Sequence, residues 1–562
     1  LDKLFYKNYF IKIYIQFKED KTNLSFKTCI FMYNMCGIYI ETKFSTTDRD
    51  ISKLIKRGPD NTRETITSHG TRVIFSRLCI NDLSENGNQP FCNQGITVVC
   101  NGEIYNSNEL RIANEFDLKS TSDCEVILPL FLKYGFVECV KQLHGVFSLC
   151  IIDNRGGTEK LYVARDRLGV RPMYSANGCE GQLILSSLAH PLNGCTNIGQ
   201  VAPGIYEAYK GGLYSVAEWS CNKYTPDYNI SFNDACLKVK TSLLQSVSMR
   251  MNSDVPIGCL LSGGLDSSLI VSIMSSLLPE GKRVRTYSVG MENSTDLLAA
   301  RKVASYLNTD HHEIIFTEEE ALKVIPEVIG AIESYDVTTV RASIGMYILC
   351  KWIKNNTSPR VIFSGEGSDE LLQGYLYFHK APTSKQGAFE SNRLVNELYN
   401  YDVLRCDRCV SSNGLEIRVP FLDTDFVDLT LQIPSDFKHP RWEETDCEKY
   451  LLRKAFIGYL PEEILWRRKE GMSDGTGTIK RPLSVVIAEY LEDRVASASR
   501  TPLRGDALPL ESTAIKREEA WYKELFSNIF PSYNLDLPMW LPRWSNSEDP
   551  SGRGESIFRC EL

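Results

Sequence analysis

The sequence predicts a mixed α/β and α+β protein, with an N-terminal domain of αββα-layered or sandwich type followed by a doubly wound parallel-sheet domain. Short β-type runs separated by turns fill residues 36–225, whereas helix-like segments alternate with short buried strands in residues 226–562. Many strands with few helices favour a layered sandwich, and strand–helix alternation favours a parallel sheet. A polar, turn-like stretch at 221–232 is the expected boundary.

Four β-type runs are expected in the first domain, at Arg72–Phe75, Gly95–Cys100, Val146–Asp153 and Lys160–Ala164. Residues 121–125 open an apolar, helix-like stretch that reaches Leu132. Ser122 or Asp123 is the expected N-cap of that helix, because their side chains accept hydrogen bonds from exposed backbone N–H groups.

Four buried strands are expected in the second domain, at Pro256–Leu261, Val284–Val289, His311–Phe316 and Arg360–Phe363. Helical patterns separate them, so a ligand site is expected at the carboxyl ends of these parallel strands. Residues 429–562 are expected to be mostly helical and irregular.

Composition restricts the function classes. With 43% hydrophobic and 24% charged residues, the chain is typical of a globular protein, and its net charge of −8 disfavours a general nucleic-acid or anionic-membrane role. No apolar run reaches membrane-spanning length. The 18 cysteines are scattered, which indicates reduced thiols in a reducing compartment. The pair Cys406 and Cys409 is interpreted as two unrelated thiols; a redox role is the alternative, and zinc is disfavoured.

Cys36 is the most informative residue, in the run Met35-Cys36-Gly37-Ile38. As the first residue of a mature chain, it would carry a thiol and a free α-amino group. The reference pKa of that amine, ~7.7–8.0, suits a general base, so one residue serves as nucleophile and base. We therefore expect residues 1–35 to be a leader outside the mature chain. Lysines interrupt its apolar stretches, so no secretory signal is predicted.

The strongest local motif is Ser262-Gly263-Gly264-Leu265-Asp266-Ser267-Ser268, directly after an apolar strand and before a helical pattern. Strand, Gly-Ser loop and helix start together favour an anion site, because backbone N–H groups converge there. The motif lacks the lysine of the Walker pattern. An ordinary Gly-Ser turn is the alternative interpretation.

A second cluster, Ser364-Gly365-Glu366-Gly367-Ser368-Asp369-Glu370, also follows an apolar run. Its three acids repel one another unless cations are near, and two such acids beside a polyphosphate suggest Mg²⁺. A solvated acidic loop is the alternative.

Two further segments carry weaker signals. Lys469, within Trp466–Gly475, could stabilise phosphate charge, although basic clusters are usually surface features. Arg341, within Asp336–Arg341, suits a carboxylate, but a structural salt bridge is equally compatible with the sequence.

Asn101 and Gly102 offer a side-chain NH₂ and an unhindered backbone N–H, which together can form an oxyanion hole. A β-turn is the alternative, because Asn-Gly is a strong hairpin signal.

Taken together, these residues resemble a known family. Cys36–Ile38, RGPD (57–60), Arg77-Leu78, NGEIYN (101–106) and Asp123 look like a class II glutamine amidotransferase domain, an N-terminal-nucleophile (Ntn) hydrolase. SGGLDSS (262–268), FSGEGSDELLQGY (363–375), LEIRVPFLD (415–423) and LWRRKE (465–470) look like the synthetase domain of glutamine-hydrolysing asparagine synthetases, with an ATP-pyrophosphatase-like fold. GMENSTDLLAARKVA (290–304), YDVTTVRASIGMYI (335–348) and DPSGR (549–553) fit the same family.

The resemblance implies ATP-dependent synthesis of asparagine from aspartate with glutamine-derived ammonia, through a β-aspartyl-AMP intermediate. It implies catalytic roles for Cys36, Asn101, Gly102, Glu366 and Lys469. Glutamine would be bound by Arg77, Leu78, Cys79, Ile80, Asn81, Asn101, Gly102, Glu103 and Asp123. ATP would be bound by Leu260, Ser262, Gly263, Gly264, Asp266, Ser267, Ser268, Val289, Ser364 and Gly365. Aspartate would be bound by Thr338 and Arg341, and Mg²⁺ accompanying ATP by Asp266 and Asp369. The implied protein is cytoplasmic, binds these small substrates, and has a homodimer as one expected assembly.

The chain departs from the family pattern in two places. Ser186-Ser187-Leu188-Ala189 stands where the family usually has Ser-Glu-x-Lys, and Asn81 replaces an apolar residue. These changes concern local packing or the domain interface. Two other functions remain as alternatives: a related ligase that closes a lactam ring or amidates another carboxylate, and a non-catalytic binding protein. The terminal cysteine disfavours the first, and the presence of Cys36, Glu366 and Lys469 together disfavours the second.

Overall fold

The computed structural model describes residues 36–43, 49–210, 213–220, 225–440, 447–469, 471, 475–478, 481–498, 513–533 and 537–545. All of them belong to one compact unit, residues 32–562. The predicted leader 1–35, part of the boundary stretch (221–224), residues 470 and 472–474, and the motif at 549–553 lie outside the described residues.

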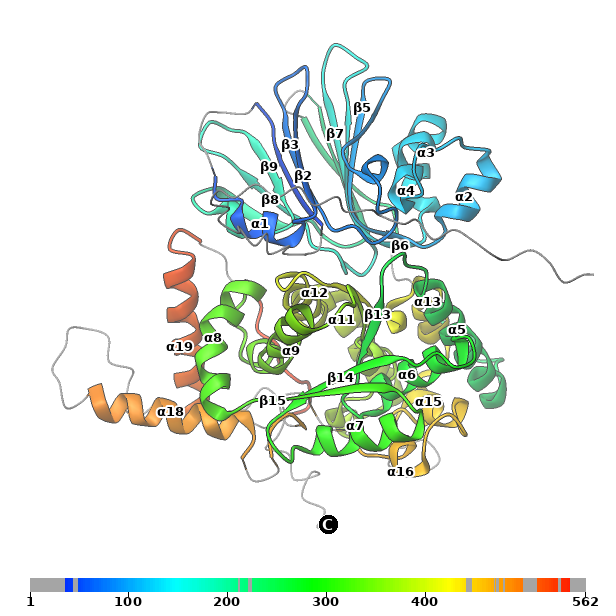
Figure 1. Ribbon diagram of the computed structural model, residues 1–562, viewed down its shortest axis with the longest axis vertical. Coiled ribbons are helices and arrows are strands. Elements are labelled where there is room, and N and C mark those ends of the chain that lie inside the picture. Colours follow the sequence, from blue (N-terminus) through cyan, green and yellow to red (C-terminus); the bar gives the residue numbers. More distant parts are fainter. Residues whose placement is uncertain are drawn as a thin grey trace, which may run out of the picture. The chain divides into compact units, whose positions relative to one another are not determined.

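Two antiparallel sheets form the first half of the described chain, shown in blue to cyan in Figure 1. The first sheet has the order β10 (Thr196–Gln200), β8 (Tyr174–Asn177), β9 (Leu183–Ser186), β1 (Gly37–Glu41), β3 (Arg72–Arg77), β2 (Asn61–Ile66). The second has the order β12 (Leu213–Glu218), β11 (Ile205–Lys210), β7 (Lys160–Arg165), β6 (Gly145–Asp153), β5 (Ile96–Ile104), β4 (Phe91–Asn93).

Apolar side chains from both sheets interlock between them. Ile38 and Phe75 from the first sheet share a buried cluster with Val99, Ile152 and Val163 from the second. Strands that alternate apolar residues toward a facing sheet produce this arrangement.

Helices cover the outer faces of both sheets. Leu54 of α1 (Ser52–Arg57) packs against the first sheet, and a second cluster joins β5 and β6 to α3 and α4. The remaining elements are α2 (Ser107–Asn114), α3 (Ile127–Tyr134), α4 (Phe136–Gln142), and the 3₁₀ turns η1 (Glu85–Gly87), η2 (Asp123–Val126) and η3 (His190–Leu192). The predicted αββα layering is confirmed. Ser122 does precede η2, but its side chain makes no capping hydrogen bond, so the expected N-cap contact is wrong.

A parallel sheet organises the second half, with the order β15 (Asp310–Ile315), β14 (Arg285–Gly290), β13 (Ile257–Leu260), β16 (Val361–Phe363), β17 (Glu416–Arg418). The four predicted strands are present, and their pairing is parallel throughout. The sequence did not predict β17, because a three-residue strand that contains Glu416 and Arg418 has no apolar run.

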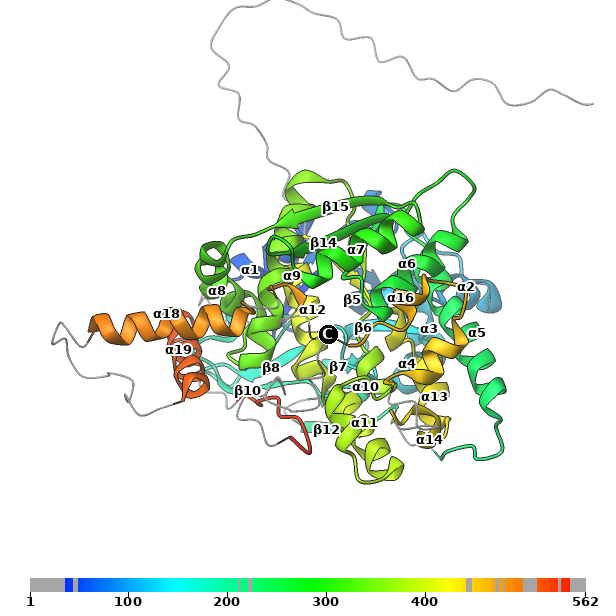
Figure 2. The same cartoon turned by 90° about the horizontal axis from the view of Figure 1, so that it is seen from below.

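Helices surround the parallel sheet, as Figure 2 shows from below. Their bounds are α5 (Phe232–Arg250), α6 (Leu265–Leu277), α7 (Thr295–Tyr306), α8 (Glu318–Ile332), α9 (Val337–Asn356), α10 (Ser368–Leu371), η4 (Leu376–Lys380), α11 (Ser384–Glu397), η5 (Leu398–Asn400), α12 (Asp402–Ser411), η6 (Pro420–Leu422), α13 (Thr424–Gln432), α14 (Ser435–Lys438), α15 (Tyr450–Ala455), α16 (Glu462–Leu465), α18 (Leu483–Ala498) and α19 (Ala514–Ile529). The doubly wound class and the mostly helical C-terminal part are confirmed for the described residues. Within them, no helix combines the length and apolarity needed to cross a membrane.

Candidate active sites

The thiol of Cys36 lies at the start of β1, against the segment that follows β3. The backbone N–H of Leu78 donates to Sγ at 3.3 Å, and Sγ is 3.7 Å from the Leu78 carbonyl oxygen. Burial raises the pKa of Cys36 to about 12, although the Leu78 backbone and the Arg77 charge act to lower it. The thiol is therefore protonated at neutral pH and needs a base to become a nucleophile.

Asn101 and Gly102 lie in β5. The side chain of Asn101 is buried, yet neither its Nδ2 nor its Oδ1 has a hydrogen-bond partner among the described residues. A buried amide without partners is costly unless a ligand completes it. At Gly102 a Cβ would lie 2.1 Å from the Val146 carbonyl oxygen, so only glycine fits. These features favour an oxyanion hole over a simple turn, because the two residues are inside a strand.

The contacts of Arg77 differ from those expected of a residue that binds glutamine. Its terminal nitrogens donate to the carbonyl oxygens of Asn81, Asp82 and Ser84 and to Oδ1 of Asn88. The guanidinium thus shapes the loop after β3, and a substrate carboxylate would have to share or displace these contacts. Cys79 and Ile80 belong to the same loop, where the backbone N–H of Cys79 donates to Asp60.

Glu103 and Asp123 lie together at the end of β5. Asn81 Nδ2 donates to Oε2 of Glu103 at 2.6 Å, and the Ile104 N–H donates to Asp123 at 2.6 Å. Burial raises the pKa of Glu103, and the charges of Asp123 and Glu416 raise it further. Burial also raises the pKa of Asp123. A cationic ammonium would relieve this repulsion, so the pair suits the α-amino end of an amino acid.

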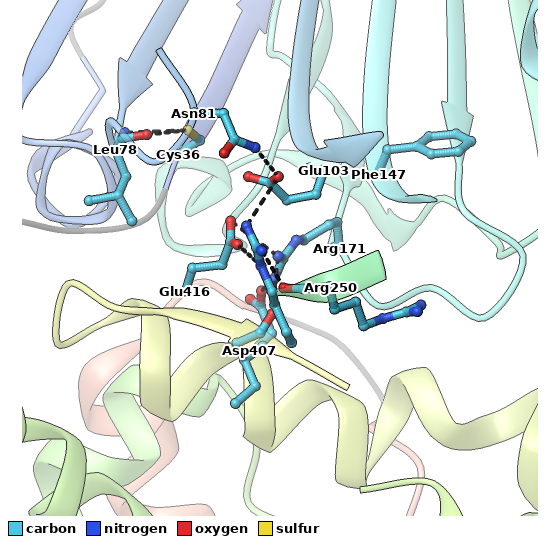
Figure 3. A network of polar contacts seen from close by, with 12 residues as sticks. Cys36, Leu78, Asn81, Glu103, Phe147, Arg171, Arg250, Asp407 and Glu416 are labelled. Atoms are coloured by element: carbon cyan, nitrogen blue, oxygen red, sulfur yellow. Dashed lines mark hydrogen bonds and ion pairs between the residues drawn. The ribbon is translucent and has the colours of Figure 1, made fainter. Parts of the chain in front are cut away.

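Charged side chains from the second half of the chain meet Glu103 (Figure 3). Arg418 NH2 lies 3.2 Å from Glu103 Oε2, and Arg171 NH2 lies 3.5 Å from Glu416 Oε2. Arg171 NH1 also lies 3.3 Å from Oδ1 of Asp407. All these side chains are nearly fully buried, so the two halves share a buried ion-pair network that reaches the Cys36 region.

A cavity of about 490 Å³ opens where β13 and β16 end, within the size range of small-molecule sites. Of the predicted nucleotide and substrate residues, its lining includes Leu260, Ser262, Gly264, Asp266, Ser267, Thr338, Ser364, Gly365, Glu366, Asp369 and Lys469. The lining does not include Gly263, Ser268, Val289 or Arg341. The two Gly-Ser motifs, about 100 residues apart in sequence, thus face one space.

Close packing explains the small residues of these loops. Gly263 has φ +72°, and a Cβ there would lie 2.4 Å from the Ala300 backbone nitrogen. A Cβ at Gly365 would lie 2.8 Å from the Ser267 nitrogen. The hydroxyl groups of Ser262 and Ser267 are 3.1 Å apart. Backbone N–H groups and hydroxyls at the start of α6 provide the donors expected of a phosphate site.

The predicted metal ligands Asp266 and Asp369 converge on one point. Nζ of Lys449 lies there, 2.6 Å from Asp266 Oδ2 and 2.5 Å from Asp369 Oδ1, and Nζ of Lys469 lies 2.6 Å from Asp369 Oδ2. Burial raises the pKa of Asp369, but the two ammonium groups lower it to about 2. Carboxylate oxygens that converge in this way are suitable donors for Mg²⁺, so the residues fit the ion by type and direction.

Glu366 lies beside these carboxylates, with Oε2 2.9 Å from NH2 of Arg405. Burial raises the pKa of Glu366, and the charge of Arg405 opposes that rise. A carboxyl with a raised pKa in a cavity is suited to proton transfer near neutral pH.

Thr338 and Arg341 lie near the start of α9 but have different surroundings. Thr338 lines the cavity, and its buried hydroxyl has no hydrogen-bond partner among the described residues. Arg341 is buried in a two-point ion pair with Glu518 of α19, with contacts of 2.8 and 2.5 Å. The structure therefore does not bring Arg341 to the cavity, and the salt-bridge alternative describes its position.

Comparison with known proteins shows the family of the chain. A family model described as "Asparagine synthase" matches residues 238–398 and 390–544, and one described as "Glutamine amidotransferase domain" matches residues 35–203. The chain is 38% identical to "Asparagine synthetase [glutamine-hydrolyzing]" of Bos taurus over 94% of this chain and 99% of that protein. It is 37% identical to the protein of the same description in Gallus gallus, over 94% and 100%. The chain belongs to the asparagine synthase family.

The structure accounts for the two departures from the asparagine synthase pattern. Ser187 Oγ accepts a hydrogen bond from the Ile38 N–H next to the thiol strand, and its carbonyl accepts one from Arg408. The backbone N–H groups of Ala189 and His190 both donate to Glu333 of the second half. Main-chain atoms thus maintain the domain contact without the missing charged side chains. Asn81, the other departure, donates to Glu103.

Several cavity residues were not predicted from sequence. Lys449, Asp402, Arg405, Tyr375 and Trp540 all line it. They lie outside the Gly-Ser loops, on helices or irregular segments with no local pattern that separates them from core or surface residues. Membership of the asparagine synthase family does not by itself reveal these residues; only the tertiary structure places them in the cavity.

Proposed function

We propose that this protein is an asparagine synthase that hydrolyses glutamine, a carbon–nitrogen ligase with glutamine as the amido-nitrogen donor. It makes L-asparagine from L-aspartate, L-glutamine and ATP, and releases AMP, pyrophosphate and L-glutamate. One observation carries the proposal: a half-buried thiol held by the Leu78 backbone and a buried amide without partners, Asn101, lie in one half of the chain, and a charged cavity at the ends of parallel strands lies in the other.

In the glutaminase reaction, Sγ of Cys36 attacks the side-chain amide carbon of glutamine. The α-amino group of Cys36 takes the thiol proton, while Asn101 Nδ2 and the Gly102 N–H hold the developing oxyanion. Ammonia leaves, and water hydrolyses the thioester to glutamate. Glu103 and Asp123 hold the substrate ammonium, which their shared burial favours. The loop that Arg77 organises, Leu78–Asn81, forms the wall of this site.

In the synthetase reaction, the β-carboxylate of aspartate attacks the α-phosphorus of ATP, and pyrophosphate leaves. Ammonia then attacks the acyl carbon of the β-aspartyl-AMP, and AMP leaves. Residues 262–268 bind the phosphates, and Lys469 stabilises their charge. Glu366 accepts a proton from the attacking ammonia, which its raised pKa favours. Thr338 supplies its free hydroxyl to the aspartate.

Mg²⁺ bound with ATP would be held by Asp266 and Asp369, and would neutralise the phosphate charge. We also propose a cytoplasmic location, since the described cysteines are free thiols, as a reducing compartment allows. A homodimer is the proposed assembly. Light scattering of the purified protein tests the assembly, and cell fractionation tests the location.

Isotopic product analysis tests the whole reaction. With glutamine labelled by ¹⁵N in the side-chain amide, the label should appear in the asparagine amide, and AMP should accumulate in equal amount. Accumulation of ADP, or an amidated product other than asparagine, would contradict the proposed reaction. A reaction with unlabelled glutamine and ¹⁵N-ammonium is the matched control for exchange with free ammonia.

A further inference from the structure

A buried lysine bridges the two carboxylates predicted to bind the metal ion. Asp266 belongs to α6, Asp369 belongs to α10, and Lys449 directly precedes α15. One atom, Nζ of Lys449, lies 2.6 Å from Asp266 and 2.5 Å from Asp369. A Mg²⁺ ion bound by the same oxygens would need distances of about 2.0–2.1 Å. The ammonium and the ion would therefore compete for one position.

Three features hold the lysine in this position. Its side chain is only 2% exposed. Its backbone adopts the left-handed region with φ 58°, which is unusual for a residue other than glycine. A Cβ at Gly374 would lie 1.9 Å from Cε of Lys449 and 2.2 Å from Oδ1 of Asp369. The glycine leaves room for the end of the lysine, so the bridge is part of the packing and not a loose surface contact.

The local charge is balanced without a metal ion. Two carboxylates, Asp266 and Asp369, face two ammonium groups, Lys449 and Lys469. A divalent cation gains little from a neutral group of charges, and an ammonium within 3 Å repels it. Apart from the 2.5 Å contact with Nζ of Lys449, Oδ1 of Asp369 has no hydrogen-bond partner among the described residues, so it becomes a free ligand atom once Lys449 moves.

We propose that Lys449 is the resident counter-ion of the Asp266–Asp369 pair in the nucleotide-free protein, and that a divalent ion replaces it only when a triphosphate binds. The phosphates bring the negative charge that accepts both the ion and the displaced ammonium. Metal and nucleotide therefore enter as one unit, and free metal is excluded. The inference rests on the proposed function only in taking a nucleoside triphosphate as the ligand of this cavity.

Mn²⁺ binding without nucleotide, measured by electron paramagnetic resonance, tests the exclusion. Wild-type protein and Lys449→Arg should bind no Mn²⁺ at this site below millimolar concentration. Lys449→Met should bind one ion at least tenfold more tightly, and adding Asp369→Asn should remove that gain. Lys454→Met, at an exposed lysine of α15, the helix that Lys449 precedes, is the control and should match wild type. Lys449→Gln replaces the methionine variant if that variant does not fold.

Equal Mn²⁺ binding by wild type and Lys449→Met, or binding by neither, would overturn the inference. Calorimetric titration with inorganic pyrophosphate, without metal, tests where the ammonium goes. Lys449→Met should bind pyrophosphate at least tenfold more weakly than wild type, and unchanged affinity would overturn the transfer to phosphate. Neither measurement requires turnover. If asparagine is not formed, the proposed function fails while these binding results still decide the role of Lys449.

Discussion

The two catalytic regions are built from different kinds of contact. The thiol of Cys36 contacts the backbone of Leu78, and the same half of the chain holds a buried amide, Asn101, without partners among the described residues. In the cavity at the ends of β13 and β16, Asp369 and Glu366 each contact a cationic side chain. At the first site the atoms in contact with the thiol itself are neutral main-chain atoms. The second depends on a balance of buried charges, so removing one charge there affects its neighbours as well.

Replacing Cys36 should separate the two regions most clearly. Cys36→Ala should abolish glutamine-dependent asparagine synthesis and leave ammonia-dependent synthesis near the wild-type rate, because only the first site loses its nucleophile. Steady-state assays with each nitrogen donor measure this. Cys92→Ala, at an exposed thiol of β4, should keep both activities. If a folded Cys36→Ala protein loses both activities equally, the two sites are not independent.

Removing the charge of Glu366 should have the reverse effect. Glu366→Gln keeps the size of the side chain but leaves Arg405 without one of its partners and removes the proton acceptor. Asparagine formation should fall by about 10²–10⁴-fold, while glutamine hydrolysis continues. Glu327→Gln, at a half-exposed ion pair with Lys351, is the matched control. Near-normal asparagine formation by Glu366→Gln would mean that the acidic loop is only structural.

The sequence predicted the parts of the molecule that local pattern determines. Strand runs such as 146–153 and the strand–loop–helix at 257–268 follow from apolar periodicity and glycine placement, and the structure confirms them. Parallel strands end at the same edge of a sheet, so the sequence also predicts that the loops after β13 and β16 lie close together.

The roles of individual charged residues were less predictable, because the partner lies far away in sequence. Arg341 forms an ion pair with Glu518, 177 residues later, and Lys449 forms one with Asp266, 183 residues earlier. Arg77 donates to its own loop instead of leaving its donors free for a ligand. The local sequence around a basic residue does not show which of these partners it will meet. Only the tertiary packing decides which acid, carbonyl or substrate it meets.

The Arg341–Glu518 pair gives a charged contact that supports the cavity without lining it. Glu518→Gln should lower the free energy of unfolding by about 3 kcal/mol, because a buried guanidinium loses its anion. The KM for aspartate should stay near its wild-type value at temperatures where the variant is folded. Chemical denaturation and aspartate kinetics measure the two effects.

Thr338→Val is the companion variant, since it removes a hydroxyl that faces the cavity and has no structural partner among the described residues. It should raise the KM for aspartate with little change in stability. The opposite result, a raised KM for aspartate in Glu518→Gln without loss of stability, would indicate that Arg341 does contribute to aspartate binding.

The smallest expected effect concerns the contact between the halves at His144, which lies between α4 and β6. Its Nε2 is 3.0 Å from Asp423 Oδ2, and Nδ1 is 3.9 Å from Asp425. Burial lowers the pKa of His144, but Asp423 and Asp425 outweigh that effect and raise it above its usual value, against the opposing charge of Arg250. A raised pKa in the folded state stabilises the protein below the unfolded value near ~6.5. That stabilisation is lost as the pH rises through the folded value.

Scanning calorimetry between pH 6 and pH 9 should therefore show that the unfolding temperature of the wild-type protein falls more with rising pH than that of His144→Asn. The difference should be about 1 kcal/mol or less. Asp425 is exposed to solvent, and an exposed ion pair contributes little because water and salt screen the attraction between its charges. His69→Asn, at an exposed histidine between β2 and β3, should keep the wild-type slope. Identical slopes for wild type and His144→Asn would show that the imidazole is neutral at this contact. Asp423 would then keep only its ion pair with Arg250 of the same half, whose atoms are 2.7 Å apart.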